Sequence, residues 1–313
     1  HVPEDMFGLF LDCRANPGDW WWGGIDANGN GDPSRHGTEL QPVENRCIHT
    51  IRHVMTAYPV DPMRVYGVGN SMGGSGVLGI GMNHGDLFAA ILANVPAGVE
   101  HVVDRCCLLG DKPEGFTIPD PPVVVDYSAQ NDSWSRGHEK LYRGMRENRY
   151  ALIGYFGPFG HENNLARMRA VNDLILWQDM LSLRLNEAYP AFTNAASDDK
   201  NPWENTISDN AAGQVNAYFC WKNRIDMPDK LEIELSLMHK EDWQTEKQVP
   251  TETTADVTLR RIQRFAYQTG DTIAYTFGSQ TGSVIIPDSG VITIPELHIT
   301  QTENVLCLYH TVL

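Results

Sequence analysis

Three residues have the types and the chain order that nucleophilic catalysis requires: Ser71, Asp132 and His161. A serine hydroxyl is a weak nucleophile until a base takes its proton, and a third group must orient that base. Here the serine comes first, the acid second and the histidine third, each just behind an apolar segment. This arrangement predicts acyl transfer through a covalent intermediate on Ser71.

The serine lies in Gly69-Asn-Ser-Met-Gly73, a G-x-S-x-G motif. An apolar strand is expected over 64–68, and a helix of small residues is expected from about Gly74. A strand, a sharp turn and a helix are the setting in which this motif presents a strained, exposed serine. We expect glycine at 69 and 73 because side chains there would collide with the strand or the helix. The alternative is a glycine-rich turn with an incidental serine.

The acid follows an apolar segment at 122–127 that we expect to be a strand. Asp132 lies in the loop behind this strand, where the acid of such a site belongs. Asp126 lies at the strand end, too early to reach over the sheet edge, so we rank Asp132 first. The competing interpretation is a loop aspartate that caps the segment 133–138.

His161 alone among the eleven histidines has both the required order and the required context. It follows a strand expected over 150–155 and precedes a helix expected over 164–185. His138 is too close to Asp132 and lies in an expected helix. The alternative for His161 is a purely structural histidine.

Acyl transfer also needs backbone N–H groups aimed at the developing oxyanion. Met72, directly after the serine, is expected to supply one of them. No H-G-G-x motif is present to supply the second, and the loop at Cys13 and Arg14 is our candidate. The second donor can also lie elsewhere in the chain.

Four tryptophans are candidates for the wall of an aryl or short-acyl pocket: Trp20, Trp21, Trp22 and Trp134. The first three are consecutive in an expected loop, where three large rings cannot all face inward. They form either a pocket wall or a plug over the core.

The elements around these residues indicate a mixed architecture. Strands expected at 88–95, 122–127 and 150–155 alternate with helices at 137–148 and 164–185, which is typical of an α/β region with a largely parallel sheet. Before the serine, we expect a buried strand from Met6 to Cys13 and a helix from Glu44 to Tyr58.

The pattern changes at about residue 201, where helical spacing ends. Short alternating segments separated by turn residues follow, which suggests a β-sandwich of immunoglobulin or fibronectin-III type. We therefore expect two domains, a catalytic α/β domain at 1–200 and a β-sandwich at 201–313. The expected strands of the second domain are 214–221, 230–237, 255–262, 272–277, 283–287, 291–294 and 304–309.

Composition narrows the partners. A formal net charge of −16 argues against nucleic acid and against anionic membrane surfaces, and no run of 18 apolar residues is present to cross a bilayer. Asp26-Ala-Asn-Gly-Asn-Gly-Asp32 matches half of a calcium loop, but Gly37 stands where the bidentate glutamate belongs. We therefore expect a polar turn there, and no metal or cofactor. We favour a secreted or periplasmic location and leave a homo-oligomer open.

The stretch Asp61-Pro-Met-Arg-Val-Tyr-Gly-Val-Gly-Asn-Ser-Met-Gly-Gly74 resembles the nucleophile elbow of the feruloyl-esterase and polyhydroxybutyrate-depolymerase-like branch of the α/β-hydrolases. The resemblance covers about Phe7 to Ala191, and the chain is similar to metagenome-type carboxylesterases with a C-terminal β-domain. Asn70 stands where histidine is common. The resemblance implies an α/β-hydrolase sheet and a serine carboxylesterase without a cofactor. Its substrates would be short-acyl or aryl (feruloyl-type) esters, as small molecules or linked to polysaccharide.

The sequence departs from this family before the serine, because only one strand precedes the motif where the fold normally has four. We expect the N-terminal strands of the hydrolase sheet to be missing; if another polypeptide holds them, the N-terminal region should show an exposed apolar sheet edge. Two other functions stay in view: a serine peptidase of the prolyl-oligopeptidase kind, and a non-catalytic polysaccharide-binding protein with a decayed hydrolase domain.

Overall fold

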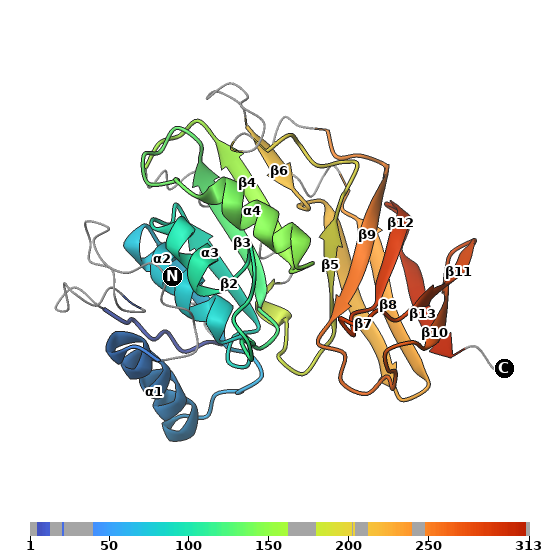
Figure 1. Cartoon of the computed structure of the whole chain (residues 1–313), viewed down its shortest axis with the longest axis horizontal. Coiled ribbons are helices and arrows are strands. Elements are labelled where there is room, and N and C mark those ends of the chain that lie inside the picture. Colours follow the sequence, from blue (N-terminus) through green and yellow to red (C-terminus); the bar gives the residue numbers. More distant parts are fainter. Residues whose placement is uncertain are drawn as a thin grey trace.

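The computed structural model describes residues 5–12, 21, 40–161, 180–201, 203, 212–239 and 248–310 (Figure 1). The helices are α1 (Pro42–Ala57), α2 (Met72–Asn83), α3 (Val99–Arg105) and α4 (His138–Glu147), with a 3₁₀ turn η1 (Met180–Ser182). The strands are β1 (Tyr66–Asn70), β2 (Ala90–Asn94), β3 (Val123–Ala129), β4 (Leu152–Gly157), β5 (Tyr189–Thr193), β6 (Gly213–Val215), β7 (Phe219–Met227), β8 (Lys230–Leu237), β9 (Glu252–Arg260), β10 (Thr272–Phe277), β11 (Gln280–Ile285), β12 (Thr293–Thr300) and β13 (Asn304–His310).

The first sheet has the order β1-β2-β3-β4-β6. Its first four strands are parallel, and β6 adds an antiparallel edge. The expected parallel α/β sheet is therefore confirmed. All residues of β2, β3 and β4 are buried, because parallel strands covered on both faces are apolar throughout rather than alternating.

The two faces of this sheet have different covers. Ile91 and Val124 point into a core that the helices share, whereas their neighbours Leu92 and Val125 point into a core that includes the antiparallel strands. This alternation follows from the two-residue repeat of a strand. The antiparallel strands, orange to red in Figure 1, lie to one side of the parallel sheet and its helices.

The C-terminal region contains two antiparallel sheets, with the orders β11-β10-β13-β8-β7 and β12-β9-β5. In β8, Leu231, Ile233 and Leu235 are buried and alternate with partly exposed residues, as in a sheet with one face on a core. Antiparallel sheets are thus present where short strands were expected. The immunoglobulin or fibronectin-III topology stays a prediction.

The expected boundary at 200/201 falls between β5 and β6, and each of these strands pairs across it. β5, at 189–193, pairs with β9 of the C-terminal region. β6, at 213–215, pairs with β4 of the parallel sheet. The sequence did not indicate β5 as a strand, because it is only five residues long and contains Pro190.

Two arginines at the end of β9 fix the C-terminal region against the parallel sheet. Arg261 donates to the carbonyl oxygens of Gly85 (2.6 Å), Phe88 (2.9 Å) and Asp120 (3.1 Å), which lie just before β2 and β3. Arg260 is paired with the Asp120 carboxylate. A guanidinium is suited to this contact because its donors form a rigid fork.

The expected buried strand from Met6 to Cys13 is wrong over its described part. Residues 7–12 are not in a strand, and Phe7, Leu9 and Phe10 are exposed. These apolar residues pair with no sheet edge, so they gain none of the cross-strand contacts that stabilise a strand. Among the described residues, β1 pairs only with β2, and Val68 of β1 is 66% exposed. Within the described part of the chain, β1 is therefore an edge strand with one exposed apolar side chain, Val68.

The long helix expected over 164–185 is testable only at its end, since 162–179 lie outside the described residues. There the structure has the short turn η1, and residues 183–185 are not helical. Within the described ranges, none of the helices has the length and apolar character needed to traverse a bilayer.

Candidate active site

Ser71, Asp132 and His161 come from three loops at one edge of the parallel sheet. Ser71 directly follows β1, Asp132 lies three residues after β3 and His161 four residues after β4. The carboxyl ends of parallel strands meet at the same edge, and sites in open α/β sheets form there. Residues from 71 to 161 therefore come together without a long excursion of the chain.

The turn at Ser71 is strained in the manner expected of G-x-S-x-G. Ser71 has φ 55° and ψ −119°, a conformation that costs a non-glycine residue of order 1–3 kcal/mol. A Cβ at Gly69 would lie 1.9 Å from the Gly73 carbonyl oxygen, which confirms the need for glycine there. At Gly73 the expectation is wrong, because a Cβ would meet nothing within 4 Å; the crowding is at Gly74, 2.6 Å from the Asn94 carbonyl.

The three side chains form one continuous hydrogen-bonded chain. Ser71 Oγ lies 2.6 Å from His161 Nε2, and His161 Nδ1 lies 2.6 Å from Asp132 Oδ2. An ionised carboxylate only accepts hydrogen bonds, so Nδ1 carries the proton in this arrangement. The Nε2 lone pair then faces the Ser71 hydroxyl, which is the tautomer that a general base requires.

Asp132 is held from two sides. Its Oδ1 accepts the backbone N–H of Trp134 at 2.9 Å, while Oδ2 contacts His161. Its own N–H donates to the Ala129 carbonyl at 3.2 Å. Only 6% of Asp132 is exposed. Oδ1 therefore holds the start of the 133–138 turn while Oδ2 lies on His161, and these two contacts fix the orientation of the carboxylate. The N-cap of α4 is Gly137, not Asp132.

Asn131, which sequence reasoning missed, joins the acid loop to the histidine loop. Its Oδ1 accepts the N–H of Gly160 at 2.8 Å, one residue before His161. Gly160 has φ 61°, a backbone conformation that favours glycine. The F-G-H end of the loop gave a weak signal for this turn, but nothing in the sequence indicated Asn131 as its partner.

The candidate oxyanion donors lie only partly within the described residues. Met72 is the first residue of α2, so its N–H has no intrahelical partner. Trp21 is buried, and its indole N–H donates to the Met72 carbonyl at 2.6 Å. The ring lies against Gly76, where a Cβ would be 2.5 Å away. Trp21 therefore packs against the N-terminal part of α2 and helps to hold it in place.

Several expected residues fall outside the described part of the chain. They are Cys13 and Arg14 of the proposed second donor loop, Trp20 and Trp22 of the pocket wall, and the calcium-like stretch 26–32 with Gly37. Their roles stay predictions. No cluster of three or more His, Cys, Asp or Glu side chains with metal-binding geometry occurs among the described residues.

Trp134 borders the hydrogen-bonded chain. Its ring centroid lies 6.2 Å from that of His161 at an interplanar angle of 42°, and 46% of the residue is exposed. An exposed indole beside His161 presents an apolar surface at the rim of this candidate site.

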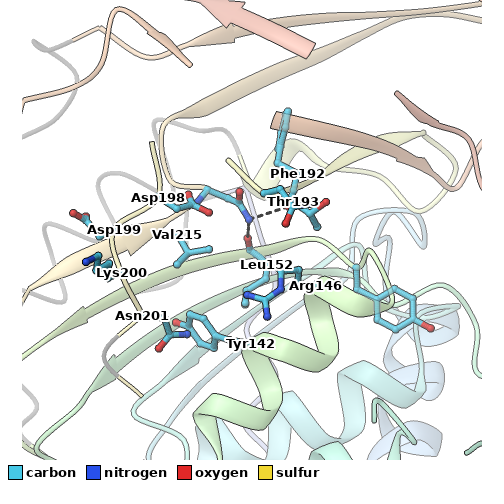
Figure 2. A pocket seen from close by; sticks show the side chains of 13 residues that line it. Tyr142, Arg146, Leu152, Phe192, Thr193, Asp198, Asp199, Lys200, Asn201 and Val215 are labelled. Atoms are coloured by element: carbon cyan, nitrogen blue, oxygen red, sulfur yellow. Dashed lines mark hydrogen bonds between the residues drawn. The ribbon is translucent and has the colours of Figure 1, made fainter. Parts of the chain in front are cut away.

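A separate cavity of about 180 Å³ lies between α4, β4 and the 193–201 segment (Figure 2). Ser71, Asp132 and His161 do not line it. Asp198 lines this cavity, where its carboxylate accepts the Asn216 N–H at 2.7 Å. Burial raises the pKa of Asp198 to about 7. Lys200 and Arg146 also line it, so both acidic and basic side chains border the cavity.

Comparisons with known proteins give partial structural similarity. No protein-family model and no curated protein matches the sequence. FphF, a fluorophosphonate-binding serine hydrolase of Staphylococcus aureus, has 14% identity and a TM-score of 0.35, over 49% of this chain and 69% of its own. The S-formylglutathione hydrolase FrmB from Staphylococcus aureus has 16% identity and a TM-score of 0.33, over 44% and 60%. The capsule O-acetyltransferase of Neisseria meningitidis serogroup A has 16% identity and a TM-score of 0.31, over 48% and 70%.

Proposed function

We propose that this chain is a serine carboxylesterase that uses a Ser-His-Asp triad. The observation that carries the proposal is the hydrogen-bonded chain in which Ser71 and Asp132 contact opposite nitrogens of His161, each at 2.6 Å. A nucleophile within reach of a base that a third group orients is the geometry of activated hydroxyl catalysis.

Ester hydrolysis proceeds in two stages, acylation of Ser71 and then its deacylation. Ser71 Oγ attacks the ester carbonyl carbon while its proton passes to His161 Nε2, and the carbonyl oxygen takes the negative charge beside the Met72 N–H. The intermediate collapses as His161 gives the proton to the departing alcohol, which leaves an acyl-serine. Water then attacks the acyl carbon as His161 takes its proton, and His161 gives that proton to Ser71 Oγ as the carboxylic acid departs.

Short-acyl or aryl esters, including feruloyl-type esters, fit the surroundings of this site. The exposed Trp134 ring lies 6.2 Å from the His161 ring. A flat apolar ring favours a planar or small acyl group by stacking and by removing apolar surface from water. A panel of p-nitrophenyl acetate, p-nitrophenyl butyrate and methyl ferulate, measured as kcat/KM, distinguishes these classes.

The geometry argues against a decayed, purely binding hydrolase domain. Ser71 retains a strained backbone, and the His161 ring keeps its short contacts with both Ser71 and Asp132, which a binding module has no reason to keep. A serine peptidase would use the same triad, and no described contact favours it. Cleavage of aminoacyl-proline substrates without ester turnover would replace the esterase proposal with that one.

The test is ester hydrolysis by the wild type and by Ser71→Ala. We expect kcat/KM for p-nitrophenyl butyrate to fall at least about 1000-fold, because the covalent path is lost. Ser279→Ala is the matched control, since Ser279 is exposed in the turn between β10 and β11. Turnover by Ser71→Ala within tenfold of wild type would overturn the assignment.

A further inference from the structure

A second aspartate–histidine pair lies in the protein core next to the turn that carries Asp132. Asp126 is in the middle of β3 and His138 is the first residue of α4, and both side chains are fully buried. His138 Nε2 lies 3.5 Å from Asp126 Oδ1. Neither group takes part in the proposed ester chemistry, so their burial needs another explanation.

With Asp126 as an ionised carboxylate, the hydrogen bonds around His138 place a proton on both ring nitrogens. Nδ1 lies 2.6 Å from the Ser135 carbonyl oxygen, which only accepts. Nε2 lies 2.8 Å from Ser128 Oγ, and that hydroxyl gives its single proton to Asp126 Oδ1 at 2.8 Å. Ser128 Oγ must therefore accept from Nε2. With Asp126 ionised, the ring is thus an imidazolium and Asp126 is its counter-ion.

The remaining neighbours complete this environment. Tyr142 donates to Asp126 Oδ2 at 2.8 Å, and Trp203 stacks on the His138 ring at 4.7 Å between centroids. Burial alone lowers the pKa of His138, but the charge of Asp126 and the hydrogen bonds to Asp126 and the Ser135 carbonyl outweigh it, aided by Glu139, so the net pKa is raised.

The imidazolium contacts the end of the turn that carries the triad acid. The Ser135 N–H and hydroxyl both donate to the Asp132 carbonyl, at 3.1 Å and 2.8 Å. The Ser135 carbonyl in turn accepts from His138 Nδ1. Trp203 Nε1 donates to Ser135 Oγ at 3.3 Å. A short path of hydrogen bonds thus connects Asp126 in the core to the backbone of Asp132.

We infer that His138, as a buried imidazolium paired with Asp126, is a positioning residue that holds the Asp132 turn against His161. This inference rests on the proposed esterase function. Loss of the Nδ1 proton leaves the Ser135 carbonyl without its donor. Loss of the Nε2 proton turns the Ser128 hydroxyl toward Nε2 and leaves the Asp126 carboxylate without the Ser128 donor. An unsatisfied buried group is costly, so the turn relaxes and Asp132 loses its place.

The first test needs no activity. Long-range ¹H–¹⁵N spectra of histidine-labelled protein report the protonation of each ring, and His138→Gln identifies the His138 signals by their loss. We expect both His138 nitrogens to be protonated at pH 7. A neutral His138 ring at pH 7 would overturn the inference, whether or not the protein hydrolyses esters.

The second test is the pH profile of ester hydrolysis. For His138→Gln we expect kcat to fall about 10- to 100-fold with KM little changed, because a small misplacement of a catalytic group has that effect. Because deprotonation of His138 releases the Asp132 turn, we expect wild-type kcat to decline at alkaline pH. This decline should disappear in His138→Gln and move to lower pH in Asp126→Asn, which removes the counter-charge. His49→Gln, at an exposed position on α1, is the control.

Asp126→Asn also serves if His138→Gln does not fold. Equal alkaline limbs in wild type and in whichever of the two variants folds would contradict the positioning role. An inactive wild type with an imidazolium at His138 would instead overturn the esterase proposal and leave the buried ion pair standing.

Discussion

Asp126 and Asp132 leave the same strand within six residues of one another, and each contacts a histidine, but the two pairs lie in different surroundings. The His161 side chain is 33% exposed, whereas the side chains of His138 and Asp126 are 0% exposed. His161 has one nitrogen on the carboxylate and the other on the Ser71 hydroxyl. His138 has both nitrogens on fixed protein acceptors.

The same two residue types, aspartate and histidine, suit different roles in these two pairs because their surroundings differ. At His161, Nε2 faces a group that can give up its proton and reform the bond with a substrate oxygen, so the ring can cycle between two states. At His138, every proton already has a buried acceptor, so loss of one leaves an unsatisfied group. We call Asp132 and His161 the open pair, which suits catalysis. We call Asp126 and His138 the sealed pair, which suits the positioning of neighbouring groups.

The largest expected effect comes from breaking the open pair. His161→Ala should lower kcat/KM by about 10⁴-fold or more, because the serine loses its base. The free energy of unfolding should change by less than about 1 kcal/mol, since the ring is exposed. Ester kinetics and urea unfolding measure the two quantities. Unaltered turnover would remove His161 from the mechanism.

Breaking the sealed pair should reverse these proportions. His138→Leu should lower the free energy of unfolding by about 3–5 kcal/mol, because Asp126 becomes an unpaired buried charge. The double variant with Asp126→Leu should recover part of that loss, since two apolar groups need no partners. Urea unfolding of the single and double variants measures both. A double variant as unstable as the sum of the single ones would show that the two residues are not coupled.

The sealed pair should also give stability a defined pH dependence. The pKa of His138 is raised in the folded state from an ordinary value of 6.5. Its contribution to stability is therefore fully present below about pH 6.5 and is lost as the pH rises through the folded-state pKa. Each unit of difference is worth about 1.4 kcal/mol. Unfolding measured from pH 6 to pH 9 should show this decline in wild type and a smaller one in His138→Gln; parallel curves would contradict it.

A smaller effect is expected at the link between the two loops. Asn131→Ala removes the acceptor for the Gly160 N–H. We expect kcat/KM to fall about tenfold with little change in stability, because Asn131 is exposed and only the position of His161 changes. Asn131→Asp keeps an acceptor oxygen and should retain more of the activity. An Asn131→Ala enzyme as active as wild type would show that the His161 loop is held by other contacts.

Much of the site was predictable because its signals are local. Gly69 is required by a carbonyl 1.9 Å from its Cβ position, and that requirement is written in the motif. Asp132 could be chosen over Asp126 by its distance past the strand end, and the structure brings Asp132, not Asp126, to His161. The partner of Asp126 could not be predicted, because only tertiary contacts of α4 bring His138 to Asp126.

The observed fold also differs from the expected one where it depends on contacts between distant segments of the chain. The apolar pattern of residues 6–12 is that of a strand, but a strand also needs a sheet edge to pair with, and residues 7–12 pair with none. The strands at 189–193 and 213–215 each pair across the expected boundary at 200/201. Such pairings depend on register between distant segments, which local periodicity does not specify.

Reaction with a fluorophosphonate, followed by intact mass and peptide mapping, tests the central claim most directly. Such a probe modifies a serine only where the hydroxyl is activated and the developing oxyanion is stabilised. We expect one adduct, on Ser71, in wild type and none in Ser71→Ala or His161→Ala. An adduct on another serine, or an equal rate of labelling in wild type and His161→Ala, would contradict it.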